Sequence, residues 1–259
     1  MFTHLNVHSH YSRMQGTASQ PSLLTAARNQ GMRHIAFTET NGLWGFIRFV
    51  QHAYAAEVEP IAGVNLITEQ GEAVLLAENQ NGYENISRIV SAIHDKPIQS
   101  IVDILKDYTV GLFVLAHERS TLSSLSKIIP NSHLFVELRP GVTERAAQQL
   151  SREFKLEIVA TGDVYFIRRE DWHTHRILRA IDLNTTLSKL PSDTFKSDNH
   201  WFRAEKDMVR IFPNSLEAIN NTIYLAEGCK RDWSFVNTIF PYLSLKDTYQ
   251  ANQILKEKV

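Results

Sequence analysis

The chain has 259 residues, 43% of them hydrophobic, and a formal net charge of -1, which is typical of a globular protein with a sizeable apolar core. The near-neutral charge argues against binding nucleic acid through the overall field of the chain, and leaves room only for a local basic patch. A single cysteine, Cys229, excludes an internal disulfide and favours a reducing compartment. Since the sequence shows neither a signal-peptide pattern nor a run of about 18 apolar residues, it predicts a cytoplasmic protein without membrane contact.

The N-terminal stretch THLNVHSHYS, residues 3–12, contains three imidazoles and alternates apolar with polar residues. Alternation predicts a strand, in which side chains two apart share one face. The residues expected to point the same way are His4, Asn6, His8 and His10. Such a group is compatible with a metal site and equally with ordinary surface or hydrogen-bonding histidines.

Six further strand-like segments follow in chain order, with helix-like segments between most of them. The strands are expected at residues 33–40, 59–68, 72–78, 111–118, 133–140 and 157–166. Helical spacing of apolar residues covers 22–31, 43–57, 81–94, 120–129 and 142–154. This alternation predicts an α/β fold, which we interpret as a distorted, TIM-like (β/α)7 barrel of mostly parallel strands.

From about Arg169 the pattern changes to helices, at 169–182 and 213–230, which we expect to form a C-terminal helical extension packed beside the barrel. The barrel body is then expected at about 1–168 and the packed helical part at about 169–240. Residues 241–259 are expected to begin a linker or the next domain, and their last helix has an apolar stripe but no stop signal. We therefore expect the tail from about Leu243 to be poorly packed in isolation.

Polar side chains gather where the predicted strands end, and in an α/β barrel this face carries the reactive groups. They are Asn6, His8, Thr38, Glu39, Thr40, Asn65, His117, Glu118, Glu137 and Asp163. Multi-metal hydrolytic sites are assembled from His, Asp and Glu in this way, because each metal needs several nitrogen or oxygen ligands and a water. A rim of polar residues at the start of loops, which any barrel has, explains the same pattern.

The order and spacing of several motifs resemble the PHP (polymerase and histidinol phosphatase) domain, in the version at the N-terminus of the bacterial DNA polymerase III alpha subunit. The similar stretches cover nearly the whole chain and read HLNVHSHYS, GMRHIAFTETNGLWG, PIAGVNLI, LLAENQNGYENISRIVS, VATGDVYFIRREDWHTH and SLEAINNTIYLAEGC. The resemblance implies the PHP fold. It also implies a parent protein that is a DNA-directed DNA polymerase, whose polymerase carboxylates lie outside this chain.

The departures from the family pattern bear on activity. Positions at which active PHP domains carry metal ligands are occupied here by Asn6, Thr40, Asn65 and Tyr165. The residues that remain as candidate metal ligands are His8, His117 and Asp163. Neutral amide and hydroxyl oxygens are poor ligands for zinc-class ions, so we expect no cofactor beyond at most one weakly bound zinc or manganese ion, and we assign no catalytic residue.

The resemblance therefore implies a degenerate, non-hydrolytic PHP domain that acts in DNA replication, in a main replicase or in an error-prone relative. Its expected partners are the polymerase core of the same parent chain, a proofreading exonuclease subunit, and DNA through the parent protein. Two alternatives stay open. One is a metal-dependent phosphoesterase or 3′–5′ exonuclease that uses His8, His117 and Asp163, and the other is a free-standing interaction protein.

Overall fold

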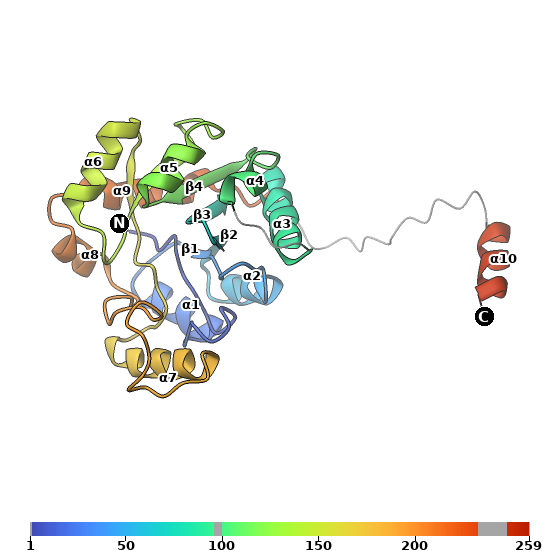
Figure 1. The fold of residues 1–259 in the computed structure, drawn as a ribbon, viewed down its shortest axis with the longest axis horizontal. Coiled ribbons are helices and arrows are strands. Elements are labelled where there is room, and N and C mark those ends of the chain that lie inside the picture. Colours follow the sequence, from blue (N-terminus) through green and yellow to red (C-terminus); the bar gives the residue numbers. More distant parts are fainter. Residues whose placement is uncertain (1, 96–99, 233–247, 259) are drawn as a thin grey trace.

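The centre of the protein is a curled six-stranded sheet (Figure 1), in a computed structural model that describes residues 2–95, 100–232 and 248–258. The strands, in the same order across the sheet as along the chain, are β1 (His34–Phe37), β2 (Glu59–Thr68), β3 (Gly71–Ala77), β4 (Leu112–Ala116), β5 (Leu134–Leu138) and β6 (Ile158–Ala160). β3 runs antiparallel to both of its neighbours, and the other pairs are parallel. The six segments correspond to six of the seven predicted strands.

The antiparallel step follows from the short connection between β2 and β3. Only Glu69 and Gln70 separate these strands, and Thr68 pairs with Gly71 at the hairpin. Parallel neighbours need a crossover of a dozen or more residues, so a connection this short joins antiparallel strands. The sheet is therefore mostly parallel, as expected from the sequence, with β3 as its one antiparallel strand among the described residues.

The N-terminal segment lies between the two edges of the curled sheet. Backbone amides in and directly after β1 donate to the carbonyls of His4 and Val7, at 3.0 and 3.2 Å. On its other side, Val7 forms a parallel bridge with Val164, which follows β6. The segment occupies the seventh strand position without forming a regular strand, and the α/β fold of the distorted (β/α)7 type is confirmed.

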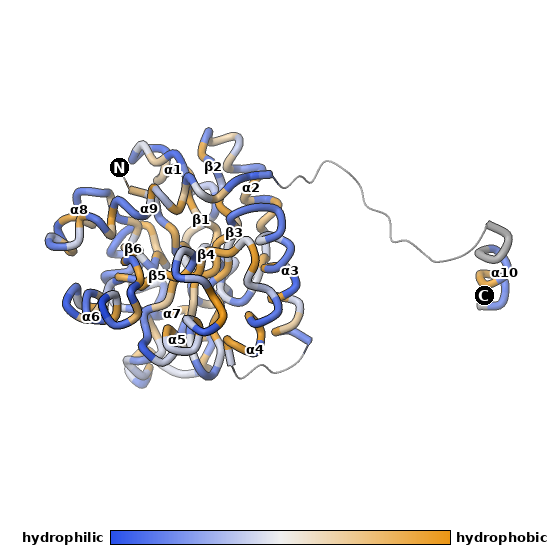
Figure 2. The backbone as a smooth tube through the Cα atoms, turned by 90° about the horizontal axis from the view of Figure 1, so that it is seen from above, coloured by the Kyte–Doolittle hydropathy of each residue, from blue (hydrophilic) through white to orange (hydrophobic). Residues whose placement is uncertain are grey.

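Helices cover the outer face of the sheet, and Figure 2 shows apolar segments concentrated at the strands. These helices are α1 (Gln20–Asn29), α2 (Phe46–Ala55), α3 (Gln80–Asp95), α4 (Ile101–Leu105), α5 (Arg119–Leu125) and α6 (Glu144–Phe154). Capping side chains mark two of the starts, because Ser19 accepts from an α1 amide and Thr143 from an α6 amide. The large apolar core lies between these helices and the sheet.

The C-terminal part consists of the short turn η1 (Arg169–Asp171) and the helices α7 (Trp172–Asp182), α8 (Glu205–Ile211) and α9 (Leu216–Gly228). α9 packs against β6, and its Leu225 and Ala226 close the inside of the curled sheet. α10 (Thr248–Lys258) follows residues 233–247, so part of the predicted 241–259 tail lies outside the described residues. No helix in the described ranges has the length and hydropathy needed to cross a membrane.

The inside of the curled sheet has two layers, because side chains two apart on a strand share one face. The lower layer is apolar and comprises Leu5, Ala36, Ile61, Val74, Leu76, Phe113, Leu115, Phe135 and Val159, with α9 below it. The upper layer, on the same strand faces, is polar and comprises Asn6, His8, Thr38, Asn65, Glu72, His117, Glu137, Arg139 and Asp163. Glu72 belongs to it because β3 runs in the reverse direction and begins at that end.

Candidate functional site

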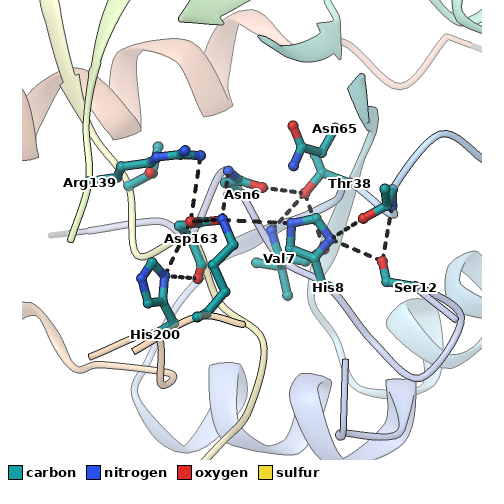
Figure 3. A network of polar contacts seen from close by, with 12 residues as sticks. Asn6, Val7, His8, Ser12, Thr38, Asn65, Arg139, Asp163 and His200 are labelled. Atoms are coloured by element: carbon teal, nitrogen blue, oxygen red, sulfur yellow. Dashed lines mark hydrogen bonds and ion pairs between the residues drawn. The ribbon is translucent and has the colours of Figure 1, made fainter. Parts of the chain in front are cut away.

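Two buried carboxylates, Glu137 on β5 and Asp163 after β6, accept hydrogen bonds from the Asn6 amide in the upper layer, and Figure 3 shows Asn6 beside Asp163. Asn6 Nδ2 donates to Glu137 Oε1 at 3.1 Å and to Asp163 Oδ1 at 3.3 Å. Asn6 Oδ1 accepts from Thr38 Oγ1 at 3.3 Å. All four side chains are buried, so the amide supplies hydrogen bonds that the carboxylates need away from water.

Arg139 brings a guanidinium into the upper layer from the end of β5. It forms a bidentate pair with Glu72 on β3, at 2.8 and 2.9 Å, and its Nη1 lies 3.5 Å from Asp163 Oδ2 and 3.7 Å from Glu137 Oε2. Burial opposes ionisation of Glu72, but the hydrogen bonds and charge of Arg139 lower the pKa of Glu72 to about 2. Arg139 therefore ties β5 to β3 through the strong, charge-assisted form of hydrogen bond.

Lys196 and His200 reach Asp163 from the segment between α7 and α8. Lys196 Nζ donates to Asp163 Oδ2 at 2.9 Å, and His200 Nδ1 donates to the Asp163 carbonyl at 2.9 Å. Burial alone would raise the pKa of Asp163, but Lys196 and Arg139 hold it well below its usual value. Asp163 has a φ of 43°, in the left-handed region that Asp tolerates, and this turn presents both its carbonyl and its carboxylate to the segment.

His175 on α7 fixes the segment that carries Lys196. Its Nδ1 donates to the Gln15 carbonyl at 2.6 Å, and its Nε2 accepts the Lys196 amide proton at 3.0 Å. Burial lowers the pKa of His175 to about 4, which keeps the ring neutral and able to accept. A cavity of about 320 Å³ lies outside this segment and is lined by Gln15, Ile67, His175, Arg179, Asp193, Thr194, Phe195 and Lys196. Lys196 therefore contacts both this cavity and the upper layer.

His8 lies in the upper layer, and its hydrogen bonds define which ring nitrogen carries the proton. Ser12 Oγ donates to Glu39 and therefore accepts the proton of His8 Nδ1, at 3.0 Å. The lone pair of His8 Nε2 then faces Asp163 Oδ1 at 3.8 Å, and within the described residues it has no hydrogen-bond partner. Burial lowers the pKa of His8 to about 3, so its ring is neutral.

Two of the positions that depart from the family pattern surround His8. Thr40 Oγ1 lies 3.4 Å from His8 Nδ1, and the Tyr165 ring stacks on the His8 ring with centroids 4.1 Å apart. Burial raises the pKa of Tyr165, so its phenol stays protonated. The structure therefore brings His8, Thr40 and Tyr165 together, as expected from the sequence, and the hydroxyl and the phenol beside the imidazole are both neutral.

Asn65 and His117 lie in the same layer beside the Arg139–Glu72 pair. Asn65 Nδ2 donates to Glu72 Oε1 at 2.9 Å, and its Oδ1 has no partner among the described residues. Arg139 Nη2 donates to His117 Nε2 at 3.0 Å. The lone pair that His117 would offer a metal is thus already engaged by a protein cation.

Residues 4–165 match the PHP domain family. The chain belongs to this family, which confirms the resemblance drawn from the motifs. Relatives include the DNA polymerase III alpha subunits of Pasteurella multocida, 28% identical over 88% of this chain, and of Bacillus subtilis, 26% identical over 99% of it. The chain spans 22% and 25% of the length of these two relatives. Among solved structures, an amidohydrolase from Chromobacterium violaceum aligns with a TM-score of 0.38 and 12% identity, over 71% of this chain and 84% of that one.

His4 and His10 do not contact the upper layer of this PHP domain. Each donates a ring proton to a backbone carbonyl elsewhere, His4 at 2.9 Å and His10 at 3.2 Å. The N-terminal segment bends at Asn6 instead of continuing as a regular strand. The expectation that the four N-terminal side chains share one face therefore holds only for Asn6 and His8.

Glu39, which follows β1, also points away from the upper layer. It accepts hydrogen bonds from the Ser9 amide and hydroxyl and from the Ser12 hydroxyl. Burial raises the pKa of Glu39 to about 7 despite these bonds. Its contribution to the site is indirect, because it sets through Ser12 which nitrogen of His8 carries the proton.

Sequence reasoning did not single out Glu72, Arg139, Lys196 or His200. A signal for Arg139 is present, because Phe135, Glu137 and Arg139 are spaced two apart and share one face of β5. Lys196 lies in an irregular segment and has no local signal. In the described part of the PHP domain, no three His, Cys, Asp or Glu side chains are arranged to hold a metal ion.

Proposed function

We propose that this chain is the PHP domain of a bacterial DNA polymerase III alpha-type subunit and that its site is non-hydrolytic. Similarity to alpha subunits over 88% and 99% of the chain supports the first part. The position of Asn6 carries the second part. Its Nδ2 directs N–H groups at both Glu137 and Asp163, and a donating amide nitrogen offers no lone pair to a cation held by these carboxylates.

The donors that remain do not fit two or three clustered metals. Paired-metal hydrolysis needs ions roughly 3.5–4 Å apart that share a water and hold both phosphate oxygens. His8 Nε2 offers an open lone pair, whereas His117 accepts from Arg139 and Asp163 accepts from Lys196. We infer that the site suits at most one weakly held zinc or manganese ion.

The role that we propose is structural and cytoplasmic, within a replication polymerase. The domain packs against the polymerase core of its parent chain and offers a docking surface to a separate proofreading exonuclease subunit. Size-exclusion chromatography of the purified chain with that exonuclease and, separately, with the polymerase core tests this role. We expect a complex with each, and two independently eluting species in both mixtures would contradict the scaffold.

The non-hydrolytic site is tested with a 3′-labelled single-stranded oligonucleotide and Mn²⁺ or Zn²⁺. We expect no metal-dependent cleavage by the natural chain, because too few charged ligands remain to offset the developing negative charge on the phosphodiester. A variant that restores the lost ligands combines Asn6→His, Thr40→His, Asn65→Glu and Tyr165→His, and it should bind more zinc or manganese by elemental analysis. Cleavage by the natural chain that His8→Ala abolishes would establish the phosphoesterase or exonuclease alternative instead.

A further inference from the structure

We propose that Arg139 and Lys196 are the resident cations of this site, so that a guanidinium and an ammonium of the protein itself fill a cation-binding site formed by Glu72, Glu137 and Asp163. The assignment deepens the proposed non-hydrolytic function, on which it rests. It names what occupies the centre in place of metal ions. It also explains why three carboxylates can be buried together, because they bind two cationic side chains of the same chain.

The three carboxylates converge on Arg139 from three different elements, β3, β5 and the turn after β6. Arg139 Nη1 lies 2.8, 3.7 and 3.5 Å from oxygens of Glu72, Glu137 and Asp163, in that order. The side chains of Glu137 and Asp163 are 1% and 0% exposed, and that of Glu72 is 16% exposed. Buried like charges repel one another, so this arrangement needs positive charge at its centre.

Both protein cations keep their charge in this environment. Arg139 Nη1 lies 2.8 Å from Glu72 Oε1, and Lys196 Nζ lies 2.9 Å from Asp163 Oδ2, so an opposite charge stabilises each cation in its buried position. The two side chains are only 10% and 25% exposed. They therefore offset two of the three carboxylate charges from within the protein.

Two further acceptors show that the site is shaped for positive charge. His8 Nε2 and Asn65 Oδ1 are fully buried and, among the described residues, have no hydrogen-bond partner. His8 Nε2 faces Asp163 Oδ1 at 3.8 Å, and Asn65 lies beside Glu72, to which it donates at 2.9 Å. Without the two protein cations, the layer would offer carboxylate oxygens and an imidazole nitrogen, which suit Mn²⁺ or Zn²⁺.

Lys196 also couples the cation site to the segment that covers it. Its ammonium binds Asp163 inside, and its backbone amide donates to His175 on α7. Filling the site with this lysine therefore holds the segment between α7 and α8 over the mouth of the barrel. A soluble metal ion would provide the charge without that tether.

The test is thermal unfolding of the natural chain and of Arg139→Met with Lys196→Met, each in EDTA and in Mn²⁺ or Zn²⁺. The natural chain should unfold at the same temperature in all three conditions. The double variant should unfold at a lower temperature in EDTA and gain about 5–10 °C at a metal concentration a hundredfold above its Kd, as linkage predicts for a chain of this size. Calorimetric titration should show one bound ion in the double variant and none in the natural chain.

Matched variants separate this assignment from general damage. Arg119→Met with Lys206→Met removes the same charges from exposed positions and should give no metal response. Arg139→Lys keeps a cation in the layer and should also stay insensitive to metal. Adding Glu72→Gln to the double variant should reduce the metal-induced gain at least fivefold, because one ligand is neutralised.

If the double variant is unfolded in EDTA, recovery of its far-ultraviolet circular dichroism on adding Mn²⁺ supports the proposal. Lys196→Met alone keeps most of the layer and should then show a metal-induced shift of its own. A Lys196→Met chain and a double variant that both ignore Mn²⁺ and Zn²⁺, or a natural chain stabilised as much as they are, would overturn the assignment. DNA cleavage by the natural chain would instead refute the non-hydrolytic function, so the two failures are distinguishable.

Discussion

The lower and upper layers of the barrel interior are built on the same strand faces but are stabilised in different ways. On β5, Phe135 belongs to the apolar lower layer, and Glu137 and Arg139, spaced two apart along the same face, belong to the polar upper layer. The lower layer is stabilised because its apolar side chains are removed from water. The upper layer stabilises the fold only if every charged group has a partner of opposite charge, because an unpaired buried charge is strongly destabilising.

This difference teaches which substitutions each layer tolerates. Apolar packing depends on volume and is indifferent to pH and ions. The ion network depends on the identity of each partner, since removing one side chain leaves several others without a counter-charge. Stability measurements on single variants can therefore tell the layers apart.

The largest effect is expected for Arg139→Met, which leaves Glu72 and Asp163 without their shared counter-charge. We expect a loss of about 3–5 kcal/mol in the free energy of unfolding, measured in urea. Adding Glu72→Met should recover part of that loss, because the unpaired carboxylate goes with its partner. Arg119→Met, which breaks an exposed pair with Glu153, serves as the control and should leave the midpoint unchanged. Equal losses at the two arginines would erase the distinction between buried and surface pairs.

An intermediate effect is expected from His175→Gln on the pH dependence of stability. The pKa of His175 is about 4 in the fold against 6.5 ordinarily, so between these values the unfolded chain binds more protons and stability falls as the pH falls. Removing the imidazole should flatten this fall by up to about 1.4 kcal/mol per pH unit. Glu39 acts in the opposite direction, because its raised pKa of about 7 makes stability fall as the pH rises from about 4.5. Urea titrations at pH 7.5, 6 and 5 measure the slope, and an unchanged slope would mean that His175 is not held neutral.

The smallest effect is expected for Ile61→Val in the lower layer. Losing one methylene from a packed interior costs about 0.5–1.5 kcal/mol. The loss should be the same at pH 7.5 and pH 5 and the same in EDTA and Mn²⁺, because Ile61 belongs to the apolar cluster and carries no titratable group. A loss that varies with pH would show that the two layers are coupled, which would weaken the comparison.

The lower layer could be predicted from sequence, whereas most of the upper layer could not. The apolar segments 59–68 and 111–118 were expected as strands and correspond to β2 and β4, which carry Ile61 and Leu115 of the lower layer. Burial of apolar residues follows from local pattern alone. The position of the polar residues at strand ends also followed from the barrel hypothesis, and Asn6, His8, Asn65, His117 and Asp163 do lie together.

The ion pairs were not predictable because their partners are far apart in sequence. Arg139 meets Glu72 only when β3 and β5 flank β4, and Lys196 reaches Asp163 from an irregular segment that has no periodicity. The alternation in residues 3–12 predicted that four side chains share one face. This prediction holds for Asn6 and His8 but is wrong for His4 and His10, because the segment bends at Asn6. Pairing across the interior is decided by tertiary geometry, which a local pattern does not encode.

The N-terminal segment also sets the order in which the barrel can form during translation. Val7 bridges Val164, so the N-terminal segment is joined to residues made more than 150 positions later. At synthesis rates of roughly 5–20 residues per second, this delay lasts about 8–30 s. During that interval the segment can pair with β1 through the carbonyls of His4 and Val7, but its other side has no partner until Val164 is made. The closing step then has a high loop entropy to overcome, so we expect barrel closure to be the late event in folding.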